Sequence, residues 1–191
     1  MLPPGHIAAG FLTAQALLAF TDHSFSSVQM AQLSFIGAFF RFAPDLDCFY
    51  SFFRLKRFTI TDDDPSHRKY YSHAPMLWLI TGLVIWFFAS DPFLKYTGLL
   101  VWLGSWSHFL LDTIQHGVMW AWPFTSNIFA IKDRGMKFHI AETKFFPFWF
   151  QFVKLYMTKA ALSFYIEIAI ILVALFIAYS SPVFTLLSNK F

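Results

Sequence analysis

The sequence predicts an all-α, polytopic integral-membrane helical bundle with about five hydrophobic helices. Of the 191 residues, 57% are hydrophobic and only 13% are charged, whereas a soluble domain carries about 25% charged residues. The chain also has 27 Phe residues, more than a core of this size can bury, so much of this apolar surface is expected to face lipid. Because no internal repeat or low-complexity linker interrupts the sequence, we expect residues 1–191 to form a single membrane-embedded domain.

Two short apolar runs open the chain, at about His6–Phe20 and Val28–Phe42. Each has about 15 residues, whereas a helix that crosses a bilayer needs about 20. These helices therefore either form a re-entrant hairpin or pack inside the bundle. Pro44 disfavours helical structure in the residue before it, so we expect the second helix to end there and to present Asp45 and Asp47 just beyond its end.

Three longer apolar runs are predicted to cross the membrane, at about 75–90, 94–115 and 160–180. Ser72 is expected to cap the first of these helices, with Pro75 in its first turn. Residues 125–159 form a basic and aromatic connection, in which Phe145–Phe150 is predicted to lie at the membrane interface rather than to span. The last run carries one acidic residue, Glu167, which we expect to be paired inside the bundle.

The basic residues indicate how the helices are oriented. Alternating the helices across the membrane places all but Lys95 and Lys190 of the 14 Lys and Arg residues on one side, which by the positive-inside rule is cytoplasmic. We interpret this charge as membrane-orienting and expect no nucleic-acid partner. Arg41 and Arg68 could instead hold an anionic group such as phosphate. The same side collects nearly every candidate ligand: His6, Asp45, Asp47, His67, His73, His108, Asp112, His116 and His139.

An apolar helix with three polar residues is the strongest single sign of function. His108, Asp112 and His116 are four residues apart, so they line one face of the predicted helix. Ionisable residues inside an apolar membrane helix are costly and usually functional. A His and an Asp at this spacing can both bind one metal ion, and the alternative is a hydrogen-bonded pair that fastens two helices together. Cys48 is the only cysteine, which excludes a Cys-rich zinc ribbon.

Five short motifs then follow one another in a recognisable order. They are Gly5-His6, Pro44-Asp-Leu-Asp47, His67-Arg68, Ser72-His73 and Ser107-His108-Phe-Leu-Leu-Asp112. Over residues 5–124 this order resembles the YdjM/DUF457 family of LexA-binding proteins of the bacterial inner membrane, for which a metal-dependent hydrolase activity is inferred. That family is distantly similar to zinc-dependent phospholipase C, which also uses an early His, an Asp after a Pro and a His-x-x-x-Asp pair on a helix.

The resemblance implies a multi-pass, membrane-bound hydrolase that holds one or two zinc ions, with manganese or iron as alternatives. It implies a phosphoester or lipid-linked substrate at the cytoplasmic membrane face, with membrane lipid as a partner. The implied metal ligands are His6, Asp45, His73, His108 and Asp112, and the implied catalytic residues are Asp47, His67 and Arg68.

Two other functions stay open at this point. One is a non-catalytic membrane regulator that binds a cytoplasmic protein such as a LexA-like repressor and uses the metal only for structure. The other is a haem protein with His73 and His108 as axial ligands, although the accompanying Asp residues argue against it. His139 and Glu142 are most simply explained by an exposed loop.

Overall fold

A computed structural model describes residues 2–47, 53, 70–115, 117–131, 139–140 and 144–180. Within these residues the chain forms six α-helices, two 3-10 helices and no β-strand, which confirms the all-α prediction. The α-helices are α1 (Pro3–Ala19), α2 (Ser27–Phe42), α4 (Pro75–Phe88), α5 (Pro92–Gln115), α6 (Phe145–Lys159) and α7 (Ala161–Ser180). The 3-10 helices are η1 (Ala43–Leu46) and η3 (Tyr71–His73).

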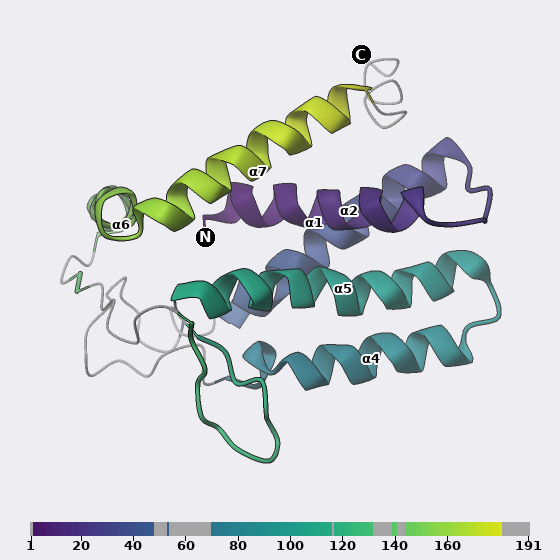
Figure 1. Cartoon of the computed structure of the whole chain (residues 1–191), viewed down its shortest axis with the longest axis horizontal. Coiled ribbons are helices and arrows are strands. Elements are labelled where there is room, and N and C mark those ends of the chain that lie inside the picture. The colour runs from purple at the N-terminus through teal and green to yellow at the C-terminus, as the bar shows by residue number, and fades with distance from the viewer. Residues whose placement is uncertain are drawn as a thin grey trace.

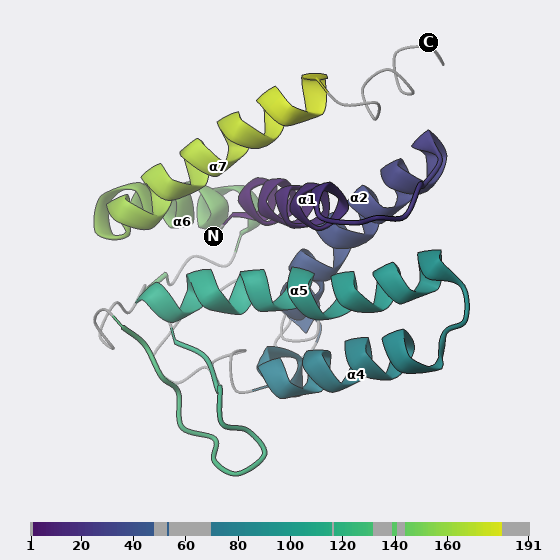
Figure 2. The same ribbon diagram turned by 45° about the vertical axis from the view of Figure 1, so that its right-hand side comes forward.

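The helices form a layered bundle in which α2 contacts both α1 and α5. Helices α4 and α5 run side by side in opposite directions, joined by a short turn (Figures 1 and 2). Helix α7 packs against α1 on the far side from α5 (Figure 1). Helix α6 is seen end-on in Figure 1 while α7 lies across the page, so α6 runs across the axis of α7.

The residues at both ends of α2 explain where this helix begins and ends. Ser26 caps its N-terminus and forms a capping box with Gln29, in which each side chain accepts from the other residue's backbone. The helix ends at Phe42, as predicted from Pro44, and the chain continues directly into η1. Asp45 therefore lies within a short 3-10 helix rather than on an open loop.

The predicted cap of the next helix was wrong. Helix α4 begins at Pro75, as expected, but its N-cap residue is Ala74, which makes no side-chain cap hydrogen bond. The hydroxyl of Ser72 instead donates to Asp47. Ser72 itself lies within η3, two residues before the N-cap residue Ala74, so its hydroxyl is not at the capping position.

Two pairs of glycines allow helices to approach closely. A Cβ on Gly37 of α2 would lie 2.7 Å from the carbonyl oxygen of Gly10 on α1. Likewise, a Cβ on Gly98 of α5 would lie 2.7 Å from the carbonyl oxygen of Gly82 on α4. Small residues at helix crossings are typical of membrane helix packing, where backbones meet directly.

Among the residues that the structure describes, α7 is the one helix both long and apolar enough to cross a membrane. Only 11% of its apolar window is buried inside the protein, so most of its apolar surface is exposed. Helix α4 is apolar but has only 14 residues. The prediction that further helices span the bilayer, with the first two short or re-entrant, stays a prediction.

Candidate metal centre

All five side chains predicted to bind metal meet at one end of the bundle. One nitrogen or oxygen atom from each of His6, Asp45 and His108 lies within 4.8 Å of the others, and the same holds for His73, His108 and Asp112. The residues come from four separate elements: the first turns of α1, η1, the end of η3 and the last turns of α5. His108 belongs to both groups, so the two groups form one continuous cluster.

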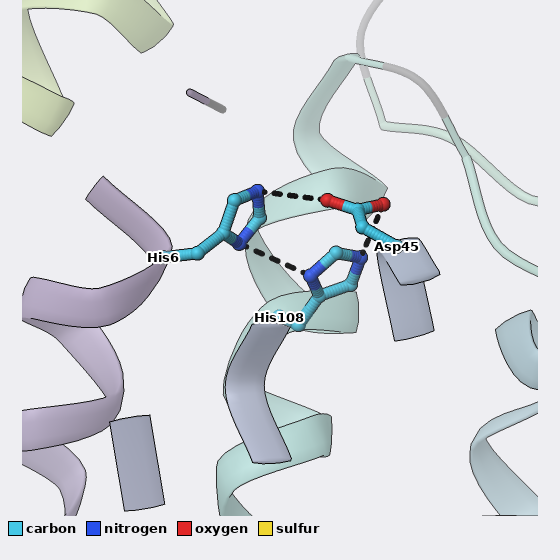
Figure 3. Close-up of side chains that lie close together, drawn as sticks. All are labelled: His6, Asp45 and His108. Atoms are coloured by element: carbon cyan, nitrogen blue, oxygen red, sulfur yellow. Dashed lines mark hydrogen bonds and ion pairs between the residues drawn. The ribbon is translucent and has the colours of Figure 1, made fainter. Parts of the chain in front are cut away.

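Three imidazole rings surround the carboxylate of Asp45. Nε2 of His6 lies 3.2 Å from Oδ2, and Nε2 of His73 lies 3.4 Å from Oδ1. Nε2 of His108 lies 3.7 Å from the same Oδ1 and 3.7 Å from Oδ2 of Asp112. Figure 3 shows His6 and His108 turned toward Asp45 from two helices. All three Nε2 atoms therefore lie close to the carboxylate of Asp45, in an arrangement that could hold a metal ion.

The rings of His6 and His108 also contact each other directly. They are stacked with centroids 4.5 Å apart, and their Nδ1 atoms are 3.1 Å apart (Figure 3). A hydrogen bond between two Nδ1 atoms requires one ring to donate and the other to accept. When both rings are neutral, the donating ring keeps a lone pair on Nε2 that can bind a cation.

The ring of His73 is oriented by Asp47 and Ser72. Its Nδ1 lies 2.9 Å from Oδ2 of Asp47, and the hydroxyl of Ser72 donates to the same oxygen. A carboxylate at Nδ1 fixes the tautomer and leaves Nε2 to face the cluster. Burial alone would lower the pKa of His73, but the hydrogen bonds with Asp45 and Asp47 outweigh it and raise the pKa to about 9.

Asp45 is both the centre of the cluster and its most accessible member. Its side chain is 18% exposed, whereas those of His6, His73, His108 and Asp112 are at most 4% exposed. Burial would raise the pKa of the Asp45 carboxyl, but the neighbouring His108, His73 and His6 hold it well below its usual range. Asp45 is therefore ionised at neutral pH, and within the described residues the cluster opens to solvent on its side.

A buried cation lies beside the cluster. Arg41, in the last turn of α2, is fully buried, and its guanidinium donates to the hydroxyl of Ser107 on α5 at 2.6 Å. It also interacts electrostatically with Asp112 and Asp45. Arg41 is therefore buried close to the carboxylates of the cluster and is not exposed at the protein surface.

The remaining predicted residues divide into two groups. His67, Arg68, His116 and Glu142 lie outside the described residues. His139 is exposed and joins neither group of candidate ligands. The sequence did not predict that the hydroxyl of Ser72 donates to Asp47, the carboxylate that orients His73. The position of Ser72 directly before His73 could have indicated this role.

The family comparison covers almost the whole chain. A sequence model described as "YdjM inner membrane protein" matches residues 1–184. The chain belongs to this family. The YdjM match extends through α7, beyond the residues 5–124 over which the motifs show the resemblance. As an inner-membrane family, YdjM fits a chain that has one helix able to cross a membrane. Searches of curated proteins and of solved structures found no similar protein.

Proposed function

We propose that this YdjM-family protein is a membrane-bound, metal-dependent hydrolase whose centre is held by His6, Asp45, His73, His108 and Asp112. The convergence of these five side chains from four separate elements carries the proposal. In addition, Nε2 of His6 and Nε2 of His108 are buried and make no hydrogen bond among the described residues, only ion-pair contacts with carboxylates. Buried nitrogens without a hydrogen bond are costly, and a cation bound at the Nε2 that carries a lone pair would stabilise it.

The donor set suits zinc. Imidazole nitrogens with carboxylate oxygens form many catalytic zinc sites, whereas structural zinc sites are closed by four protein ligands and are often rich in Cys. Manganese and iron accept the same donors. Five candidate ligands exceed the four that one tetrahedral ion takes, so either a second ion is bound or one carboxylate serves as a base. The exposed side of Asp45 favours a catalytic centre with an open position.

Each group has a role in hydrolysis of a phosphoester. A divalent cation bound here would lower the pKa of water and polarise the scissile bond. Asp45 is ionised and is the most exposed of the five side chains, so its carboxylate oxygens can bind the cation. Asp47 holds the His73 ring in place through Nδ1, and the predicted catalytic role of Asp47 stays a prediction. Arg41 keeps a positive charge beside the carboxylates, which lowers the cost of burying them.

The protein surface near the proposed metal centre favours a lipid or lipid-linked substrate. Helix α6 lies beside the start of the chain in Figure 1, and His6 is in the first turns of α1. On α6, Phe146 and Phe150 are 81% and 74% exposed, with exposed Lys154 on the same helix. Exposed aromatic and basic residues on one helix are typical of a membrane surface. We propose that the centre faces the cytoplasm, as the positive-inside rule predicts.

Metal analysis of the protein purified in detergent tests the proposal. Wild type should hold one or two equivalents of zinc, and a variant with both His108→Ala and Asp112→Ala should hold almost none. His23→Ala is the matched control, because His23 is exposed in the turn between α1 and α2 and should leave the metal content unchanged. Equal, sub-stoichiometric metal in all three proteins would rule out the centre.

Turnover is tested separately. The zinc-loaded protein should hydrolyse a phospholipid or soluble phosphoester, lose this activity with a chelator and regain it with zinc. Stoichiometric metal without hydrolysis of any ester would instead favour the alternative function, a membrane regulator with a structural metal that binds a cytoplasmic protein.

A further inference from the structure

Glu167 is a buried carboxylate outside the proposed metal centre. It lies in α7, is 2% exposed, and its two oxygens lie 3.0 and 3.1 Å from the backbone nitrogen of Leu2, which donates to them. The hydroxyl of Tyr156 on α6 donates to Oε2 at 2.7 Å. A carboxylate within an apolar helix is costly unless paired, and its partners here confirm the predicted pairing. Glu167 therefore connects α7, α6 and the chain just before α1.

The contact with Leu2 caps α1 from another helix. Leu2 is the N-cap residue of α1 and makes no side-chain cap hydrogen bond of its own. The first backbone N–H groups of a helix lack partners within the helix and attract negative charge. The Glu167 carboxylate satisfies the N–H of Leu2, and the carbonyl of Leu2 in turn accepts from the N–H of His6 at 3.2 Å. One turn of helix thus separates the carboxylate from a candidate metal ligand.

Gly5 and Tyr156 show that the Glu167 side chain fits closely against the first turn of α1. A Cβ on Gly5 would collide with the side chain of Glu167, so only glycine at this position lets the carboxylate lie against the first turn of α1. Burial, followed by the hydrogen bond to Glu167, raises the pKa of Tyr156 well above its ordinary value. The Tyr156 hydroxyl therefore stays protonated and keeps donating to Glu167.

We propose that Glu167 is a positioning residue of the metal centre, which fixes the first turn of α1 and thereby places His6 against Asp45 and His108. This inference rests on the proposed centre. His6 contacts both residues at 3.1–3.2 Å, so a small shift of the first turn would separate them. Groups that orient metal ligands typically change metal affinity about 10- to 100-fold when removed.

The test measures zinc affinity and hydrogen exchange on the full chain in detergent. Glu167→Ala should weaken zinc binding about tenfold or more and should speed exchange of the first-turn amides of α1 in the metal-free protein. Glu167→Gln keeps one acceptor oxygen and should fall between wild type and Glu167→Ala. Ala174→Gly is the matched control, because Ala174 is a buried residue of the same helix about two turns away. It should loosen α7 without changing zinc affinity.

The outcomes separate this proposal from the proposed function. If wild type binds zinc and Glu167→Ala matches Ala174→Gly in both affinity and exchange, then Glu167 has only a structural role and the positioning proposal is overturned, while the centre stands. If wild type itself binds no zinc, the centre fails and the positioning role fails with it. Weaker binding in Glu167→Ala alone, together with faster exchange in the first turn of α1, supports the proposal.

Discussion

The centre is organised around a single carboxylate. Three imidazoles approach Asp45 within 3.7 Å, and without a cation the proton on His73, whose pKa is about 9, places a positive charge beside it. A metal ion at the same point would displace that proton, since ligating His must be neutral. Metal binding at the proposed centre would therefore be coupled to proton release from His73.

Asp47→Asn tests whether Asp47 orients His73 or performs chemistry. The substitution keeps the shape of the side chain but removes the negative charge next to Nδ1 of His73. If Asp47 orients the ring, zinc affinity should fall about 10- to 100-fold, as measured by competition with a chromogenic chelator.

The opposite result is equally informative. Unchanged zinc affinity with loss of hydrolysis would show that Asp47 is a catalytic residue, as the sequence predicts, and would contradict the orienting role. Asp22→Asn is the control, since Asp22 is exposed at the other end of α1.

Residues with a local signature were predictable from sequence, and residues defined by packing were not. His108 and Asp112 stand four apart in an apolar run, and Asp45 follows a helix-ending Pro44, so both signals are local. The burial of Arg41 depends on how α2 meets α5, which no local pattern encodes. The main partner of Glu167 is a backbone N–H, a group that every residue except proline carries.

At the scale of helices, the glycine contact between α1 and α2 determines where His6 lies relative to Asp45. The Gly10 and Gly37 backbones touch, and His6 and Asp45 lie near the ends of these same two helices. The spacing of the helices therefore sets the spacing of the ligands. The sequence did not predict this contact, because isolated glycines in apolar runs have many possible partners.

Gly37→Ala should disrupt this crossing. Its Cβ would lie 2.7 Å from the Gly10 carbonyl oxygen and 2.9 Å from the Cβ of Ala14, so α1 must move away. Such overpacking costs about 1–3 kcal/mol, which should appear as a lower melting temperature together with weaker zinc binding.

Gly104→Ala is the matched control for this variant. Its Cβ would also face α2 but at 3.2 Å from the Gly37 carbonyl oxygen, and replacing Gly by Ala in a helix interior gains up to about 1 kcal/mol. We expect nearly unchanged melting and zinc binding. Equal effects of Gly37→Ala and Gly104→Ala would contradict a specific role for the Gly10–Gly37 contact.

At the scale of the whole molecule, the C-terminal part was only partly predictable. The apolar run at 160–180 corresponds to α7, Ala161–Ser180. The segment Phe145–Phe150, predicted to lie at the membrane interface rather than to span, is the start of a 15-residue helix, α6, and its interfacial position stays a prediction. Pro147 is tolerated in the first turn of this helix, where no intrahelical partner is lost.

The arrangement of α6 and α7 predicts where the centre lies relative to the bilayer. If α7 crosses the membrane, α6, which runs across its axis (Figure 1), lies along the surface. Phe146, Phe150 and Met157 are exposed and share one face of α6 by helical spacing, so this face should enter the lipid. The metal centre, at the same end of the bundle, would then lie near the lipid headgroups.

Spin labels test this arrangement directly. On a Cys48→Ser background, which removes the only cysteine, single labels at Phe150, Gln151 and Leu172 should differ after reconstitution in vesicles. The label at 150 should collide more with oxygen and less with a water-soluble nickel complex than the label at 151, which faces a different side of α6. The label at 172, on the exposed surface of α7, should be the most deeply buried in lipid. Equally high nickel accessibility at 150 and 151 would place α6 in water and would remove the structural reason for a lipid substrate.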